Sequence, residues 1–378
     1  MRRLLALVCA VVFFESAFYA VITPLLPELS TTFDLSKAQA GVLTASYGVG
    51  TLVGSIPMGW LVARVGVRIT LQLGLALMVV GSVAFPLAEA APALDAARFV
   101  QGVGSAGVWT AALGWLVRSV PAQRRGASIG SALAAATIGS LFGPVLGGVA
   151  SAAGTELVFS VAAGLGAACM VVAARLPAPA RAGHASLRAL ARAVREPRIA
   201  LGLWLMILPG TLFGTINVLV PLHLDRLGGG AAAITVAFLA ASGLEALISP
   251  LAGRLTDTRG PLVPALAGLA GGTVAMSLLP WPGTVWLLVL AVLLSAPLIG
   301  FLWTPAIALV GEGAEALDVE PGFAFGLTNL GWALGQAVGS AGGAALAQAT
   351  VDAVPQLGLA AACLITLLTL RRPARTVA

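Results

Sequence analysis

The sequence has few charged side chains. Only 10% of its 378 residues are Asp, Glu, Lys or Arg, whereas a soluble domain typically carries about 25%. This shortage excludes a globular protein that faces water on every side. It also leaves no polar stretch long enough for a separate soluble catalytic domain.

Histidine and cysteine are scarce as well. The two histidines, His184 and His223, lie outside the apolar runs, and no nucleotide-binding loop or nucleophile–base pair is visible, so enzyme chemistry has little to use. The three cysteines lie inside apolar runs as small hydrophobes, without the spacing of a disulfide framework or a metal site. We therefore expect a protein that is not an enzyme and that uses no metal or other cofactor.

Apolar residues are abundant: they make up 59% of the chain, and the mean hydropathy is +0.99. At roughly 20 residues per membrane span, twelve spans use about 240 positions. In the first half, apolar runs lie near residues 4–26, 38–62, 69–88, 94–117, 127–150 and 156–174. In the second half they lie near residues 199–221, 232–253, 262–281, 285–309, 323–347 and 353–370. The pattern predicts an all-α membrane protein with twelve transmembrane helices in two pseudo-symmetric six-helix bundles.

The longest polar stretch separates the two sets of runs. It covers residues 175–198 and is rich in proline and arginine. We therefore predict an N-terminal bundle over residues 1–174, a cytoplasmic linker over 175–198 and a C-terminal bundle over 199–378.

The positions of the basic residues predict the orientation. If the N-terminus lies in the cytoplasm, the outer loops hold only Lys37 and Arg226, as the rule that positive loops stay inside requires. Arg2 and Arg3 resemble the start of a signal peptide, but the apolar run continues past Glu15 without a cleavage site, which favours an uncleaved first span. The basic side chains sit in short loops, which argues against nucleic acid as a partner. We expect a monomer in the cell (inner) membrane, in contact with the lipid bilayer, with both termini cytoplasmic.

Glycines recur at four-residue intervals in the fifth span of each half. The first set is Gly139, Gly143 and Gly147, with Pro144 and Gly148 beside it, and the second set is Gly331, Gly335, Gly339 and Gly343. Residues four apart share a helix face, and a face of glycines lets another backbone approach closely. The faces either pack static helices or slide against a partner. Their matching positions favour sliding, because internal repeats are typical of transporters whose halves rock against each other.

Four short stretches carry a family resemblance. Residues 139–148 read GSLFGPVLGG, 98–102 read RFVQG, 24–27 read PLLP and 253–260 read GRLTDTRG. The first matches the motif G-x-x-x-G-P-x-x-G-G at every fixed position, the second matches R-x-x-Q-G, and the last resembles G-x-L-x-D-R-x-G. Together they resemble the major facilitator superfamily, in particular its twelve-span drug/proton antiporters. The resemblance implies secondary active transport by alternating access, with protons and a small amphipathic or cationic compound as partners.

The same resemblance assigns conformational or gating roles. These roles are expected for the residues of the span 5 motif given above. They are also expected for seven residues of the two loop motifs: Gly59, Arg64, Gly66, Arg68, Gly253, Asp257 and Gly260. In the first copy of the loop motif, Ala63 stands where the family usually has an aspartate that helps to lock the cytoplasmic gate. Because Ala63 replaces that aspartate, the resemblance does not imply that the outward-open state is held as firmly as in the family.

Three ionisable residues lie within spans: Glu15, Arg98 and Glu245. Each costs at least about 2.5 kcal/mol to insert, so such residues usually face a cavity or a partner. Glu15 precedes Pro24 by nine residues, the spacing at which vesicular amine transporters carry a span 1 aspartate, and the resemblance implies that Glu15 recognises a cationic substrate. A buried carboxylate can hold a proton or a cation but not both comfortably, which is a basis for exchange. The alternative is a fixed Glu15–Arg98 pair that clamps spans 1 and 4.

Glu245 has two interpretations, a second proton site or a hydrogen-bonded clamp. Because span 8 packs near span 5 in the resembled family, we expect Glu245 to face the first glycine set. Seven further polar or aromatic residues are expected to line the path or to bond between helices: Tyr19, Gln101, Ser105, Asn217, Trp303, Asn329 and Gln336.

Two other functions stay open. One is proton-coupled uptake or export of a sugar or metabolite, and the other is a non-transporting sensor or scaffold on the same fold. Ala63 favours the scaffold, whereas the glycine sets and the carboxylate within a span argue against it.

Overall fold

The computed structural model describes residues 2–179, 193–317 and 321–371, and within these ranges helices are the only regular structure. The first half contains α1 (Arg2–Ala20), α2 (Ile22–Thr32), α3 (Lys37–Val65), α4 (Val67–Ala84), α5 (Ala91–Ser119), α6 (Ala122–Ala153) and α7 (Thr155–Arg175). The second half contains α9 (Pro197–Arg226), α10 (Gly230–Arg259), α11 (Leu262–Leu278), α12 (Val285–Gly300), α13 (Trp303–Ala316), α14 (Pro321–Ala337), the π-helical η1 (Val338–Gly342), α15 (Gly343–Ala349) and α16 (Ala353–Arg371).

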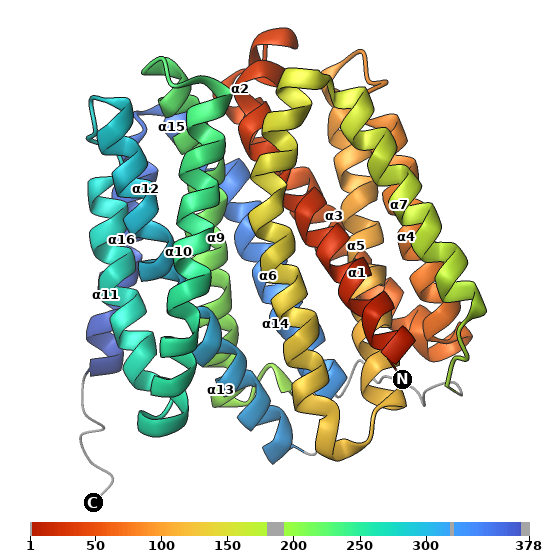
Figure 1. Cartoon of the computed structure of the whole chain (residues 1–378). Coiled ribbons are helices and arrows are strands. Elements are labelled where there is room, and N and C mark those ends of the chain that lie inside the picture. Colours follow the sequence, from red (N-terminus) through yellow and green to blue (C-terminus); the bar gives the residue numbers. More distant parts are fainter. Residues whose placement is uncertain (1, 180–192, 318–320, 372–378) are drawn as a thin grey trace, which may run out of the picture.

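The helices run between the two ends of the molecule (Figure 1). We call each passage of the chain from one end to the other a crossing. Three crossings consist of more than one element: α1 with α2, α12 with α13, and α14 with η1 and α15. The described ranges therefore make twelve crossings, six in each half. Nine helical stretches in the described part are both long and apolar enough to cross a bilayer. The all-α membrane fold predicted from the apolar runs is confirmed.

The first crossing is broken near its middle and is longer than the predicted run, which ended at residue 26. α1 ends at Ala20 and α2 begins at Ile22. Pro24 has no backbone N–H, so the carbonyl of Ala20 loses its helical partner four residues later. The break therefore leaves backbone carbonyls in the interior of the protein without helical partners. A side chain has to donate hydrogen bonds to them.

Two crossings of the second half are also irregular. Between Gly300 and Trp303 the helix axis is interrupted, and the crossing then continues to Ala316, past the predicted end at residue 309. Pro305 removes the N–H that the carbonyl of Phe301 would otherwise accept. The eleventh crossing contains the π-helical η1, a distortion that occurs mostly at functional sites in other proteins.

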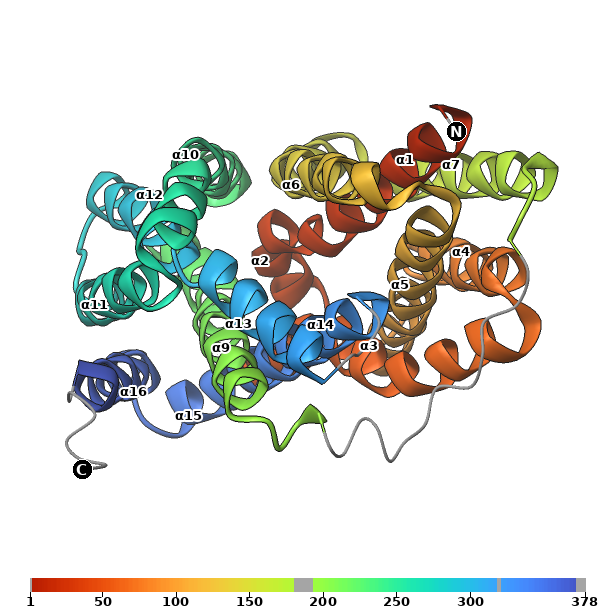
Figure 2. The ribbon, with the colours of Figure 1, turned by 90° about the horizontal axis from the view of Figure 1, so that it is seen from below.

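The twelve crossings form two bundles that lie side by side (Figure 2). Each bundle has a large hydrophobic core of its own. In the first bundle α1 packs on α6, α3 on α5 and α4 on α7. In the second bundle the equivalent spans pack in the same way, with α9 on α14, α10 on α12 and α11 on α16. This repetition is the pseudo-symmetry predicted from the sequence.

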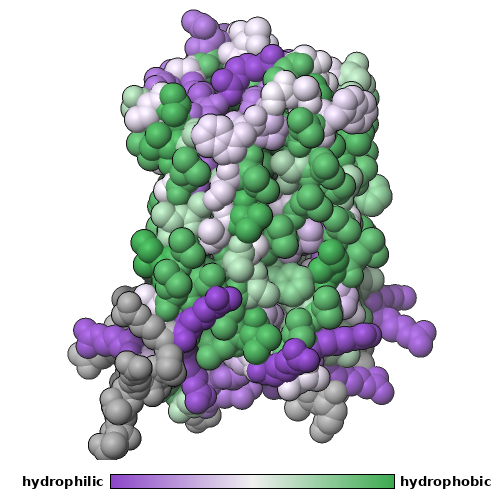
Figure 3. Space-filling view, turned by 90° about the vertical axis from the view of Figure 1, so that its left-hand side faces the viewer, coloured by the Kyte–Doolittle hydropathy of each residue, from purple (hydrophilic) through white to green (hydrophobic). Residues whose placement is uncertain are grey.

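The outer surface suits a lipid environment. Large apolar side chains point outward in both bundles, and Leu247 and Trp286 are 80% and 82% exposed. Figure 3 shows these apolar side chains as a band between two more polar ends. Burial of apolar surface in lipid replaces the charged coat that a soluble protein would need.

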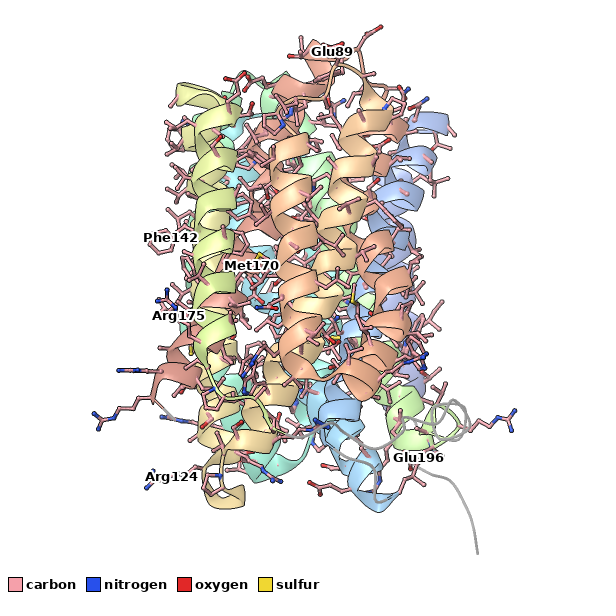
Figure 4. The ribbon with its side chains drawn as sticks, turned by 90° about the vertical axis from the view of Figure 1, so that its right-hand side faces the viewer. Glu89, Arg124, Phe142, Met170, Arg175 and Glu196 are labelled. Carbon is pink, nitrogen blue, oxygen red and sulfur yellow. The ribbon has the colours of Figure 1, made fainter. Side chains whose placement is uncertain are left out.

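α1 begins and α16 ends at the same end of the molecule (Figure 1), as an even number of crossings requires. We call this the terminal end, and the opposite one the far end. Arg124, Arg175 and Glu196 lie toward the terminal end, whereas Glu89 lies at the far end (Figure 4). Most of the predicted linker, residues 180–192 with His184 among them, lies outside the described residues.

Candidate functional site

A cavity of about 490 Å³ lies between the two bundles. Its walls come from α1, α2, α5 and α6 on one side and from α9, α10, α12, α13 and α14 on the other. This volume is within the range of small-molecule sites, about 300–1,000 Å³. Seven of the residues singled out in the sequence lie in its lining: Glu15, Tyr19, Pro144, Asn217, Glu245, Trp303 and Asn329.

Glu15 lies on the α1 wall and is only 3% exposed. Its Oε1 accepts hydrogen bonds from Ser105 Oγ at 2.5 Å and from Tyr47 Oη at 2.7 Å. Its Oε2 accepts from Trp109 Nε1 at 2.7 Å and from Ser16 Oγ at 3.2 Å. Four neutral donors therefore hold the carboxylate, and no fixed positive charge pairs with it within the described residues.

Arg98 donates hydrogen bonds to the backbone carbonyls at the break between α1 and α2. Its guanidinium donates to the carbonyl of Phe18 at 3.0 Å and to the carbonyl of Tyr19 at 3.1 Å. It also donates to Gln101 Oε1 at 3.0 Å. Carbonyls at the C-terminal end of a helix attract positive charge, so Arg98 acts as a buried cap for α1.

The alternative of a fixed Glu15–Arg98 clamp is therefore wrong. The guanidinium is used by the backbone carbonyls, and its flat face lies over the ring of Tyr47, 4.7 Å from the ring centroid. The clamp was predicted without the break in span 1, whose free carbonyls compete for the arginine.

Four predicted residues do not line the cavity: Arg98, Gln101, Ser105 and Gln336. All are buried, and Gln336 packs beside Gly48 of α3 in the other bundle. Gln101 donates to Ser82 Oγ at 3.1 Å, and Gln336 donates to Ser340 Oγ at 3.3 Å. Arg98, Gln101 and Ser105 bond between helices, the other interpretation given for polar residues in spans, whereas Gln336 bonds within its own crossing.

Glu245 lies on the opposite wall, on α10. Its Oε1 accepts a hydrogen bond from Trp303 Nε1 at 3.1 Å. A Cβ added at Gly300 would lie 2.6 Å from that oxygen, so the glycine leaves the space that the carboxylate occupies. The indole of Trp303 stacks on Phe213 with 5.8 Å between ring centroids and 13° between planes. The Glu245 carboxylate therefore contacts the residues on either side of the break in the tenth crossing. The expectation that it faces the glycines of span 5 is wrong.

Tyr19 joins the two walls. Its ring lies 5.0 Å from Trp332 of α14, centroid to centroid, and 5.5 Å from Tyr47. Its hydroxyl accepts a hydrogen bond from Asn217 Nδ2 of α9 at 3.4 Å. Because Trp332 and Asn217 belong to the second bundle, these contacts cross from one bundle to the other.

Charged side chains connect the bundles at the far end. Lys37 at the start of α3 and Arg226 at the end of α9 both form ion pairs with Asp352, each with a different carboxylate oxygen. Asp352 is 16% exposed and Lys37 is 24% exposed. Burial alone would raise the pKa of Asp352, but hydrogen bonds from Lys37 and Arg226, together with their charges, outweigh it and hold the pKa below its usual value.

Further contacts close the same end. The backbone N–H of Ala38 donates to Gln348 Oε1 at 2.7 Å. Thr235 Oγ1 of α10 donates to the carbonyl of Pro144 on α6 at 3.3 Å. A Cβ added at Gly148 would lie 2.5 Å from the Thr235 hydroxyl oxygen, so this glycine permits the approach of α10 to α6.

The remaining glycines of span 5 pack inside their own bundle. A Cβ at Gly139 would lie 2.3 Å from the carbonyl oxygen of Phe13, and one at Gly147 would lie 2.3 Å from that of Val21. A Cβ at Gly143 would contact α1 as closely. The interpretation of this set as a face that slides on the other bundle is therefore wrong, and only Gly148 contacts that bundle.

The glycines of span 11 behave in the same way. Gly335 and Gly339 lie against α9 of the same bundle, where added Cβ atoms would come within 2.2 Å and 2.1 Å of carbonyl oxygens. In both halves, therefore, the fifth span packs tightly on the first. Spacing indicates which residues share a face, but it does not indicate which helix covers that face.

The loop motifs lie at the terminal end. Gly66 ends α3 with a φ of 95°, and Gly260 ends α10 with a φ of 79°, both in the region that favours glycine. Arg64 lies over the ring of Trp60, and Arg68 donates to the carbonyl of Leu176. A Cβ would meet open space at Gly59 and Gly253, and Asp257 is exposed. The gating role of these residues stays a prediction.

Three parts of the site were missed in the sequence: Trp109, Tyr47 and the cluster around Asp352. Trp109 follows Ser105 by four residues, so it shares the polar face of span 4 and could have been found by that spacing. No spacing relation of this kind marked Tyr47 as part of the site. In the described part of the chain, no group of His, Cys, Asp and Glu could hold a metal ion.

Comparison with known families is consistent with this geometry. The family described as Major Facilitator Superfamily matches residues 8–340. A chloramphenicol resistance protein of Streptomyces lividans is 30% identical over 276 residues, which cover 67% of this chain and 69% of that protein. A probable vesicular acetylcholine transporter-B of Danio rerio is 32% identical over 158 residues, 39% of this chain.

The matches differ in extent. The aligned part of the Danio rerio protein is 32% of its length, and other curated relatives also match over about a third of theirs. Among solved structures, that of a D-xylose–proton symporter superimposes with a TM-score of 0.79 and covers 98% of this chain and 97% of its own. At 16% identity this likeness shows the fold alone.

Proposed function

The chain belongs to the major facilitator superfamily, whose members are transporters and not enzymes, and we propose that it exports small amphipathic or cationic compounds in exchange for protons. The observation that carries the proposal is the environment of Glu15. A carboxylate within a membrane span lines a cavity between two bundles, and its partners are all neutral. Such a group is free to take a proton or a cation.

The hydrogen bonds around Glu15 suggest how a proton would be held. The indole N–H of Trp109 can only donate, so it occupies Oε2 in every protonation state. The hydroxyls of Ser105 and Tyr47 can donate or accept. A proton on Oε1 therefore needs only the rotation of one hydroxyl, and the acid can gain and lose it without rearranging the helices.

A cationic substrate competes with that proton. A cationic group near the carboxylate favours the ionised form, so substrate binding releases the proton and proton binding releases the substrate. Inward movement of a proton supplies about 2.3 kcal/mol per 100 mV. Exchange of one proton for one monovalent cation is electroneutral and would draw on the pH gradient alone.

The contacts between the bundles support alternating access. In the proposed orientation the arginine-rich terminal end faces the cytoplasm. The Lys37–Asp352 pair and the Thr235 contact then close the outer side. The cavity lining extends toward the cytoplasmic side as far as Gly114, near the end of α5, and Gly326, near the start of α14. We infer that the substrate reaches the cavity from the cytoplasm in this state.

Transport into proteoliposomes tests the proposal. A panel of monovalent cations, neutral amphiphiles and sugars is offered with and without a pH gradient. We expect cations to move only with the gradient, and Glu15→Gln to abolish this movement. Glu28→Gln is the matched control, because Glu28 is exposed and lies outside the cavity lining. If only sugars move, or if movement ignores the gradient, the proposal fails.

A further inference from the structure

The two walls of the cavity carry the same pair of side chains. Glu15 accepts the indole N–H of Trp109 at 2.7 Å, and Glu245 accepts that of Trp303 at 3.1 Å. Trp109 lies 18 residues after the start of α5 at Ala91 (109 − 91), and Trp303 lies 18 residues after the start of α12 at Val285 (303 − 285). Equivalent tryptophans of spans 4 and 10 therefore each hold a carboxylate, one in each bundle.

The second pair is built as a binding surface. Gly300 leaves room for the Glu245 carboxylate, and the break before Trp303 turns the indole toward it. Phe213, which also lines the cavity, stacks on that indole. A carboxylate beside two aromatic rings is the chemistry that recognises an organic cation.

In the described part of the chain, the cavity lining contains no basic side chain to neutralise these acids. Among the described residues that line the cavity, Glu15 and Glu245 are the ionisable acids, and none is Lys, Arg or His. Two carboxylates on opposite walls of one apolar cavity create two separate attractive positions for positive charge.

We propose that the cavity binds dications, with one cationic group at Glu15 and Trp109 and the other at Glu245, Trp303 and Phe213. This inference rests on the proposed function, because it assigns a substrate class to the same cavity. A monocation occupies the Glu15 position and leaves Glu245 to a proton. A dication with an apolar middle spans both bundles and uses both positions.

A series of alkane-α,ω-bis(trimethylammonium) ions tests the inference on the wild-type protein. Each is compared with the alkyltrimethylammonium ion of the same chain length, which differs by one cationic head group. Binding is measured by isothermal titration calorimetry on the purified protein. At the best length we expect the dication to bind about tenfold more tightly, as one additional cation–aromatic and ionic contact would give. If no length favours the dication, the inference is overturned.

Variants assign the effect to Glu245. Glu245→Gln should remove the preference for the dication and change monocation binding less than twofold, whereas Glu245→Asp should retain part of it. Glu312→Gln is the matched control, because Glu312 is 46% exposed on α13. Equal losses for both ions in Glu245→Gln would contradict the second position. If monocations bind and are transported but dications bind no more tightly than monocations, this inference fails and the proposed function stands. If no cation is transported with the pH gradient, the proposed function fails as well.

Discussion

Glu15 and Arg98 both contact Tyr47, one at its hydroxyl and the other over its ring. The hydroxyl of Tyr47 donates to Glu15 at 2.7 Å, and the ring of Tyr47 lies 4.7 Å from the guanidinium carbon of Arg98. The arginine meanwhile caps the carbonyls of Phe18 and Tyr19. The guanidinium is thus engaged by carbonyls and by the tyrosine ring, and the carboxylate of Glu15 is left available for a proton or a substrate.

The capping role of Arg98 predicts a loss of stability, not only of transport. Arg98→Ala leaves two buried carbonyls without a partner, at a cost of about 1–3 kcal/mol each. We expect a lower thermal midpoint and a smaller folded yield, measured by size-exclusion chromatography after heating, and Arg98→Lys should restore part of both. Arg64→Ala is the control, since Arg64 is exposed at the terminal end. Unchanged stability in Arg98→Ala would refute the capping role.

Close packing of span 5 on span 1 predicts a graded glycine series. Gly143→Ala places a methyl group 2.4 Å from Cβ of Ala20 and should cost about 1–3 kcal/mol of stability. Gly130→Ala, on the same helix, meets open space and should be neutral or slightly stabilising. Thermal midpoints in detergent measure both variants. Equal midpoints would contradict the packing of α6 on α1.

Gly148 predicts a different effect, because its neighbour belongs to the other bundle. Gly148→Ala should leave the thermal midpoint nearly unchanged but oppose closure of the far end, since the new methyl group meets the Thr235 hydroxyl at 2.5 Å. Adding Thr235→Ala should reverse the effect. The readout is the labelling rate of a cysteine at Ser340, a buried position near Gly41, by a membrane-impermeant maleimide. No reversal in the double variant would show that the clash with Thr235 is not what opens the far end.

The Asp352 cluster predicts that closure is insensitive to pH near neutrality. The folded pKa is depressed, so the pairing is complete above the unfolded value of about 3.9 and is lost only as the pH falls through the depressed value. Only the thiolate reacts, so the labelling rate at Ser340 is divided by that of a small free thiol at the same pH. This normalised rate should be constant from pH 5 to 8. Asp352→Asn should raise it about fivefold, as loss of a partly buried pair worth about 1 kcal/mol would.

Asp34→Asn is the control for that experiment. Asp34 is exposed nearby and has a φ of 49°, which asparagine tolerates. A normalised labelling rate that rises between pH 8 and 5 in the wild type, or an Asp352→Asn rate equal to that of Asp34→Asn, would contradict the account of this cluster.

Sequence patterns predicted the fold well because the signal is local. Apolar runs of membrane length mark each crossing, and an ionisable residue such as Glu15 stands out in such a run. The breaks at Val21 and Phe301 were less visible. Proline is tolerated in many membrane helices, so its presence in a run does not by itself locate a break.

The partners of each site residue were harder to predict. Phe213 looks like an ordinary core residue in an apolar run, and only the fold places it beside a cavity. Lys37 and Asp352 are 315 positions apart, and no spacing rule connects them. The glycine set around Gly143 was recognised correctly as a close-packing face, but spacing could not identify α1 as its partner.

Proton release on binding tests the central claim most directly. Decyltrimethylammonium is added to purified protein in weak buffer, and the protons released are measured with a pH-sensitive dye between pH 5 and 9. We predict up to one proton per bound cation in the wild type and in Glu28→Gln, and none in Glu15→Gln. Cation binding without proton release at any pH, or equal release from Glu15→Gln, would contradict exchange at Glu15.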